Sequence, residues 1–265
     1  MKRLFLTIAV LAVATVCANA SNHVTKKFNN SGFVGLSVSG SFNVELIKSE
    51  TFRVEVDVPE DYLPYVSVTQ ESGKLIIGFS DDMPRKLKTF KGLRDIDAHV
   101  AMPELYLLEL SGSSELECEQ EFYSEMHRID ISVSGSSKLS GIKVKAPIVG
   151  VTVSGSSKVT MEANTSDLKL DVSGASKANV SGEASDVDMT VGGASSVNCE
   201  KLKNNYVKLD EGGASRVDLF VGGQFIVEVG GASKCVYYTE GPINLDVKGV
   251  TGASTFKKGE PKKND

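Results

Sequence analysis

The acidic side chains in the second half of the sequence are its best candidates for chemistry. Four of them stand three or five residues before a glycine that recurs along the chain: Asp171, Asp188, Asp210 and Glu228. If the segments that carry them stack as strands, neighbouring carboxylates lie about 5 to 8 Å apart on one outward face. Carboxylate pairs at such separations can cleave glycosidic bonds. Lys169 and Lys208 share this face, however, and a solvated mixture of charges is the ordinary state of a protein surface. We therefore expect no catalytic residue and keep glycan cleavage as the alternative.

Other residue types give weaker signals. His23, His99 and His127 are isolated, and no two of them stand at the spacing of metal ligands. The sequence has no G-x-S-x-G nucleophile motif and no phosphate-binding Gly-Lys loop. Its formal net charge of −5, with both signs interspersed, gives no basic patch for phosphates. We expect no metal, no cofactor and no nucleic-acid partner.

A short repeat indicates the elements that carry these residues. Its form is x-Gly-Ser/Ala-Ser, and successive central glycines are 18 to 23 residues apart. Such spacing is typical of the coils of a solenoid. We expect these glycines to allow a tight turn, because a glycine tolerates backbone angles that a Cβ would block. They are Gly112, Gly135, Gly155, Gly174, Gly193, Gly213, Gly231 and Gly252.

Apolar and polar residues alternate with period two on both sides of each glycine. Val151 and Val153 flank Thr152 before Gly155, for example, and the other copies follow the same pattern apart from Glu211 and Lys248. This alternation predicts half-buried strands. The serine two residues after each glycine has the inward parity, so we expect an internal ladder of hydroxyls bonded to one another or to backbone. Its members are Ser114, Ser137, Ser157, Ser176, Ser195, Ser215, Ser233 and Ser254.

Equivalent positions carry like residues in every copy, which favours a parallel coil over an antiparallel meander. In a coil each residue stacks about 4.8 Å above its equivalent. The sequence therefore predicts an all-β, right-handed, single-stranded parallel β-helix with rungs of about 20 residues. We expect regular rungs over 111–256, N-terminal rungs and a cap over 21–110, and a disordered charged tail over 257–265. A hairpin is expected between residues 66 and 77, and a turn or one helical turn at Pro59–Pro64.

The first residues have the features of a signal peptide over 1–20. Lys2 and Arg3 precede an apolar run from Leu4 to Val16, and a small-x-small cleavage pattern ends at Ala20. Val16 stands where a lipobox requires a small residue, so we expect no lipid anchor at Cys17. No other segment could span a bilayer as a helix. The sequence thus predicts export to the periplasm, the cell surface or the medium.

Three cysteines follow the signal peptide. In the coil, Cys118 and Cys199 lie about 19 Å apart, and Cys199 and Cys235 about 10 Å apart, from the strand spacing. A disulfide needs Cα atoms within about 7 Å. We expect all three to be free and buried.

Two segments resemble a known family. They are Val38-Ser39-Gly40-Ser41-Phe42-Asn43-Val44-Glu45-Leu46 and Pro103-Glu104-Leu105-Tyr106-Leu107-Leu108-Glu109-Leu110-Ser111-Gly112. Together with the Gly-Ser/Ala-Ser rungs they are similar to the auto-transporter adhesin, head GIN domain family, over Val24 to Phe256. The resemblance implies a right-handed β-helix and an adhesin role.

Three functions remain open at this point. The first is a non-enzymatic envelope or secreted scaffold that binds glycan or an envelope protein on its outer faces. The second is a glycan-cleaving enzyme that uses the acidic face. The third is a structural element that forms homo-oligomers through its exposed terminal rungs.

Overall fold

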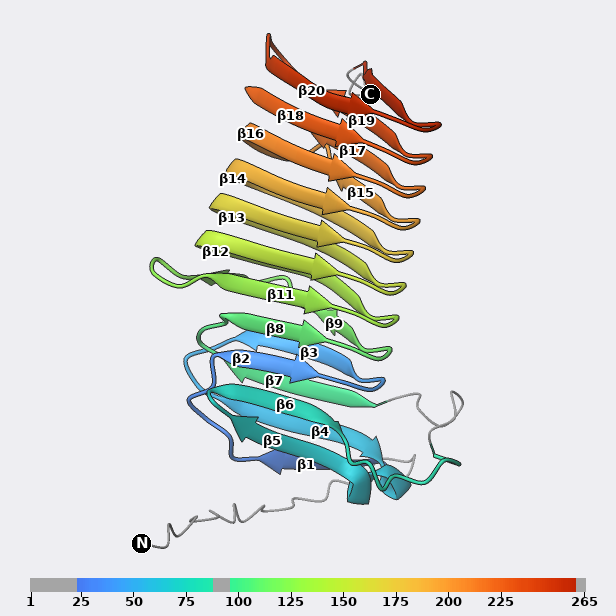
Figure 1. Ribbon diagram of the computed structural model, residues 1–265. Coiled ribbons are helices and arrows are strands. Elements are labelled where there is room, and N and C mark those ends of the chain that lie inside the picture. The colour runs from blue at the N-terminus through green and yellow to red at the C-terminus, as the bar shows by residue number, and fades with distance from the viewer. Residues whose placement is uncertain (1–22, 88–95, 261–265) are drawn as a thin grey trace, which may run out of the picture.

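The computed structural model describes residues 23–87 and 96–260. The signal peptide and Cys17 therefore lie outside the described residues. Stacked parallel strands form a β-solenoid of about eight turns, as the repeat predicts. In Figure 1 the strands before each glycine run from left to right at the front, and the chain turns back behind them as it climbs. This course makes the coil right-handed.

Each regular rung has one strand before its glycine turn and one after it. Stacked before the turn are β8 (Leu107–Leu110), β11 (Ile129–Val133), the second halves of β12 (Lys138–Val153), β13 (Lys158–Val172) and β14 (Lys177–Val191), then β16 (Leu202–Glu211), β18 (Gln224–Val229) and β20 (Asn244–Val250). Stacked after the turn are β9 (Glu115–Glu117), the first halves of β12, β13 and β14, then β15 (Ser196–Cys199), β17 (Arg216–Phe220), β19 (Lys234–Tyr238) and β21 (Thr255–Lys258). The short β10 (Glu121–Tyr123) pairs with the middle of β12.

The glycine turns form a continuous column at one edge of the stack. All eight glycines have φ between +71° and +79°, the left-handed region that glycine tolerates. The backbone of each turn also sits directly on the turn below: the amide of Ala194 donates to the carbonyl of Gly174 at 2.7 Å. A Cβ on Gly193 would collide with that same carbonyl oxygen. The glycine is therefore required twice, once for its dihedral angle and once for the close approach.

The core between the two stacks of strands, before and after the glycine turn, consists of stacked aliphatic side chains and serines. Seven serines of the ladder are at most 3% exposed, whereas Ser254 in the last rung is half-buried. Their hydroxyls mostly bond to backbone, as Ser195 Oγ does to the Gly174 carbonyl at 3.3 Å. One pair bonds directly, Ser215 to Ser233 at 3.2 Å. The hydroxyls of Ser137 and Ser157 are buried and have no hydrogen-bond partner in the part of the chain that the structure describes.

The N-terminal part does not stack in the order of the chain. The rung of β2 (Gly35–Val38) and β3 (Asn43–Lys48) lies directly under β8 and β9. Below it lies a later rung, made of β6 (Lys74–Phe79) and β7 (Asp97–Met102). The chain thus passes downward after β3 and returns, so the N-terminal rungs are stacked in an order that differs from their order in the sequence.

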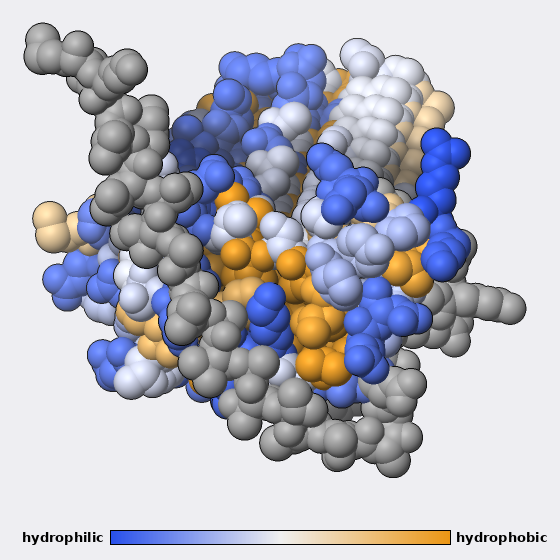
Figure 2. All heavy atoms as spheres, turned by 90° about the horizontal axis from the view of Figure 1, so that it is seen from below, coloured by the Kyte–Doolittle hydropathy of each residue, from blue (hydrophilic) through white to orange (hydrophobic). Residues whose placement is uncertain are grey.

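Antiparallel strands close this end. β4 (Arg53–Pro59) pairs with β7 and with β1 (His23–Phe28), and β5 (Val66–Glu71) forms the expected hairpin with β6. The 3-10 helix η1 (Glu60–Tyr65) connects β4 to β5, at the expected helical turn. Phe28, Leu63 and Val66 remain half-buried against the core. Figure 2 shows apolar surface at this end of the molecule.

The last rung differs from the expected tail. Strand β21 extends to Lys258, so Lys257 and Lys258 pair with Val236 and Tyr237 of β19. The tail assignment from residue 257 is corrected by these two residues, because ladder hydrogen bonds continue beyond the last apolar position. Val247 and Val250 of β20 are 43% and 44% exposed, since no described strand covers them. The two lysines are the kind of residue that protects a sheet edge against pairing.

All three described cysteines are free and buried, which confirms the prediction from rung spacing. Burial raises the pKa of each thiol, that of Cys199 to about 12. Such thiols are unreactive because the thiolate is the nucleophile.

We therefore expect the native thiols of the chain without residues 1–20 to react with Ellman's reagent at least about a thousandfold more slowly than in denaturant. That factor follows if exposure requires an opening of about 4 kcal/mol or more. Stopped-flow absorbance in buffer and in guanidinium chloride measures both rates. Rapid labelling of any cysteine in the native chain would contradict its placement in the core.

Candidate ligand groove

The four acidic candidates lie on the sheet of strands before the glycine turn, and all are exposed. Only Asp210 and Glu228 are direct neighbours across adjacent strands. Thr190 separates Asp171 from Asp210. The structure therefore does not bring the four together as one acidic cluster.

Asp188 lies in a second column of the same sheet, between two lysines. Its register neighbours are Lys169 on β13 and Lys208 on β16. Charge alternates along this column, whereas the column of Asp171, Thr190, Asp210 and Glu228 holds no basic residue.

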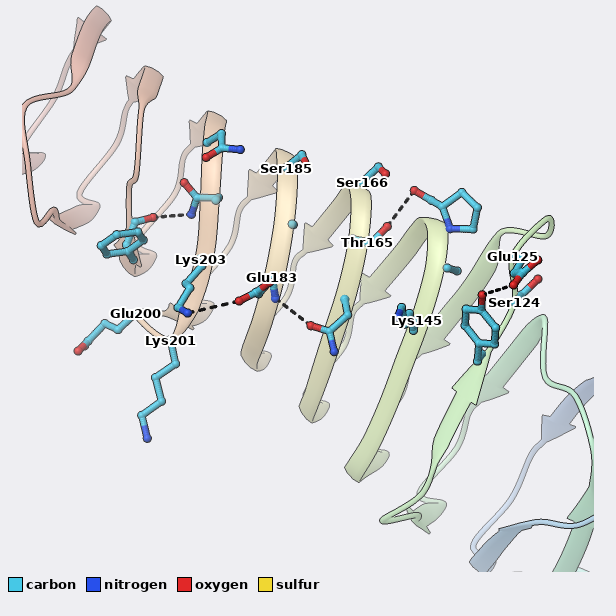
Figure 3. Close-up of a pocket in the computed structure, with 18 of the residues that line it drawn as sticks. Ser124, Glu125, Lys145, Thr165, Ser166, Glu183, Ser185, Glu200, Lys201 and Lys203 are labelled. Atoms are coloured by element: carbon cyan, nitrogen blue, oxygen red, sulfur yellow. Dashed lines mark hydrogen bonds and ion pairs between the residues drawn. The ribbon is translucent and has the colours of Figure 1, made fainter.

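A groove of about 1010 Å³ lies elsewhere, at the bend where β12, β13, β14 and β16 pass toward the next glycine turn. Figure 3 shows its side chains rising from successive rungs. Its floor comes from Ala146, Thr165, Ala184 and Asn204, which are aligned neighbours across the strands. The small side chains leave the bend hollow.

Rung length explains why the hollow forms at this bend. The glycine column fixes one corner of every rung, so differences in length must be absorbed at the other. Four rungs between Gly135 and Gly213 are 19 or 20 residues long, whereas the rung that starts at Gly112 has 23. Its extra residues form the projecting loop 124–128, where Met126 is 87% exposed. The loop and Glu240, in the 21-residue rung that starts at Gly231, stand at opposite ends of the groove.

Charged and amide side chains form one wall of the groove. Lys145, Asn164, Glu183 and Lys203 follow one another in register across β12, β13, β14 and β16. Lys203 Nζ lies 3.3 Å from a carboxylate oxygen of Glu183, and Asn164 Oδ1 accepts from the Glu183 amide at 3.1 Å. These contacts, drawn in Figure 3, hold the wall residues to one another.

Aromatic residues stand near both ends. Tyr123 is 44% exposed, and Lys145 Nζ lies 5.5 Å from the centroid of its ring. The Tyr123 hydroxyl donates to Glu125 at 2.7 Å. That bond raises the pKa of the phenol, because it requires the protonated form. Phe220 is half-buried at the other end. The groove thus offers ring faces at its ends and polar groups between them.

Asn204 fixes the shape of the floor near Phe220. Its amide nitrogen donates to the carbonyls of Leu202 at 3.0 Å and Phe220 at 2.8 Å. Its Oδ1 accepts from the Gly222 amide at 3.2 Å. Gly222 has no room for a Cβ, which would collide with the Asn204 carbonyl. The short rung from Gly213 to Gly231 is bound to its neighbour by these contacts.

The groove offers polar, charged and aromatic side chains for contact with a ligand. Within 23–87 and 96–260 no group of three or more His, Cys, Asp or Glu side chains could hold a metal ion. In the wall of the groove, Lys203 is paired with the carboxylate of Glu183 at 3.3 Å. Sequence reasoning missed the groove, although the uneven glycine spacing was its signal.

The fold is a β-solenoid whose outer surface carries a groove. The family model described as putative auto-transporter adhesin, head GIN domain, matches residues 32–241, and the chain belongs to that family. No curated protein matches the chain.

Solved structures show the same fold at low identity. A putative adhesin from Parabacteroides merdae is 18% identical with a TM-score of 0.79, and the alignment covers 94% of this chain and 100% of the adhesin chain. A putative adhesin from Parabacteroides distasonis is 14% identical with a TM-score of 0.77, and covers 90% and 98%. A structure titled putative lipid binding protein, also from P. distasonis, is 14% identical with a TM-score of 0.73, and covers 91% and 98%. No helix among the described residues is long and apolar enough to cross a membrane.

Proposed function

We propose that the protein is an exported, non-enzymatic, adhesin-like scaffold that holds an extended glycan or protein ligand in the groove along its side. The observation that carries the proposal is the groove itself: a hollow of about 1010 Å³ that crosses successive rungs and lies on regular strands. Sites built on strands hold their side chains in fixed geometry. Membership of an adhesin family and the N-terminal signal pattern agree with this role.

The enzyme alternative receives less support. A glycosidase needs two carboxylates that flank one bond. The acidic candidates are spread over a flat sheet, with Thr190 between Asp171 and Asp210. In the groove, Glu183 is paired with Lys203.

Filling the groove tests the proposal. Ser185 is exposed in the groove, whereas Thr190 is exposed on the flat sheet of the same strand, β14. We expect Ser185→Trp to weaken binding to a panel of immobilised glycans and extracellular-matrix proteins by at least about tenfold, or about 1.4 kcal/mol. Thr190→Trp should bind like the parent.

Thermal unfolding of both variants is the control, because an exposed substitution shifts stability little. Equal binding by the two tryptophan variants, with the parent active, would place the ligand outside the groove. Failure of the parent to bind anything in the panel would remove the basis for an adhesin role.

A further inference from the structure

We infer that the groove recognises an uncharged, hydroxyl-rich polysaccharide chain that lies parallel to the solenoid axis. This inference rests on the proposed function and names the ligand class of the same site. Three properties of the groove carry it: the state of its backbone, its balance of charge, and a row of unpartnered polar groups.

The backbone of the floor is already used. The strands β12, β13, β14 and β16 pair in register through the groove, including Ala146 with Thr165 and Ala184 with Asn204. An extended peptide usually gains affinity by adding a strand to a free sheet edge. No edge is available in the middle of the stack, so recognition must come from side chains.

Charge in the groove is nearly balanced. Three lysines face four glutamates among the lining residues, and Lys203 is paired with Glu183 at 3.3 Å. Lys145 lies over the Tyr123 ring. A polyanion needs a row of free cations and a polycation a row of free anions. The groove offers neither, so an uncharged chain suits it best.

A row of neutral polar groups follows one rim of the groove. Ser166, Ser185 and Asn205 occupy equivalent places in three successive rungs, adjoining the aligned residues Asp167, Asp186 and Tyr206. All three are exposed, and none makes a side-chain hydrogen bond within the described part of the chain. They offer a donor or acceptor about every 4.8 Å along the axis. A chain of sugar hydroxyls can bond to such a row repeatedly.

The aromatic ends set the length of chain that fits. Tyr123 and Phe220 belong to rungs five apart, which corresponds to about 24 Å along the axis. Each ring presents an apolar face beside polar groups, the combination that fixes orientation in small-molecule sites. Several sugar residues fit between them, so affinity should rise with chain length until both rings are covered.

Calorimetric titration of the intact chain with neutral oligosaccharides of increasing length tests the inference. The probes are gluco-, manno-, xylo- and galacto-oligosaccharides from dimer to octamer, with polygalacturonate, heparin and fibronectin for comparison. We expect at least one neutral series to bind, with affinity that rises and then levels, and that changes less than twofold on a tenfold increase in salt.

Variants then locate the binding. Combining Ser166→Ala, Ser185→Ala and Asn205→Ala should weaken the best neutral oligosaccharide at least about tenfold, since each lost hydrogen bond contributes. Thr152→Ala with Thr190→Ala, on the flat sheet, should leave it unchanged. The uncharged-glycan inference would be overturned if heparin or polygalacturonate bound in a salt-sensitive way, or if fibronectin bound, and the triple variant lost that binding. Such a result would leave a groove-binding function intact. If no probe responds to the triple variant, both proposals fall.

Discussion

Gly193→Ala should lower the free energy of unfolding by at least about 3 kcal/mol, whereas Gly192→Ala beside it should leave it unchanged or raise it slightly. Gly193 has φ of +71°, which disfavours alanine by about 1 to 2 kcal/mol. Its Cβ would also lie 2.9 Å from the amide nitrogen of Gly174 and would collide with that residue's carbonyl oxygen. Backbone lies on both sides of this contact, so the turn column would have to separate.

Gly192 is a matched control because it is the adjacent residue and loses the same hydrogen for the same methyl group. A Cβ there would meet nothing within 4 Å, and its φ lies outside the positive region. The hydrogen bond that the Gly192 amide donates to the Val172 carbonyl at 2.9 Å is retained in the alanine variant. Removing a glycine also reduces the conformational freedom of the unfolded chain, a gain of about 0.4 to 1 kcal/mol.

Urea unfolding followed by circular dichroism measures both variants. If Gly193→Ala does not fold, the failure of that variant beside a folded Gly192→Ala gives the same answer. Equal stability of the two would show that the turns are not packed as the carbonyl contacts indicate.

Glu211→Gln should remove a loss of stability of about 3 kcal/mol that the parent suffers between pH 5 and pH 8. Glu211 is 1% exposed and occupies a column in which Val191 and Val229 are its direct neighbours. Ser215 Oγ donates to one carboxyl oxygen at 2.9 Å, and the other oxygen has no hydrogen-bond partner among the described residues. Burial, with a smaller contribution from the negative charge of Asp218, raises the pKa of this carboxyl from 4.5 to about 7.

The direction of the pH effect follows from proton binding. Between pH 4.5 and 7 the folded chain keeps the proton and the unfolded chain releases it, so stability falls as pH rises through this range. The difference of about 2.5 units between the pKa of Glu211 in the folded and unfolded chain corresponds to about 3 kcal/mol of stability. Above pH 7 the loss is complete, and below pH 4.5 it is absent.

Three variants separate this effect from the rest of the chain. Glu211→Gln should match the parent near pH 5 and exceed it at pH 8, and Glu211→Val, the residue type of the column, should be more stable still at pH 8. Glu228→Gln, exposed on the same sheet in the next rung, should follow the parent at every pH. Parallel pH profiles for the parent and Glu211→Gln would mean that the carboxyl is solvated.

The regular part of the fold could be predicted from the sequence because its contacts repeat. A residue in a parallel coil touches its equivalent one rung away, so the recurrence of valine at Val133, Val153 and Val172 indicates directly that these residues are stacked. The same register places Val217 beside Cys235 and keeps the cysteines apart. The resemblance to an adhesin family depended on the same repeated segments.

Tertiary structure decided the features that break the repeat. The position of β2 between β6 and β8 depends on antiparallel closure by β4 and β5, which no period encodes. The dispersal of Asp171 and Asp210 follows from the true register, in which Thr190 lies between them. The groove depends on where each rung absorbs its extra residues, and that is fixed only when the glycine column holds the opposite corner. Local alternation of apolar and polar residues thus specifies a rung, whereas unequal rung lengths affect the structure only when the rungs are stacked.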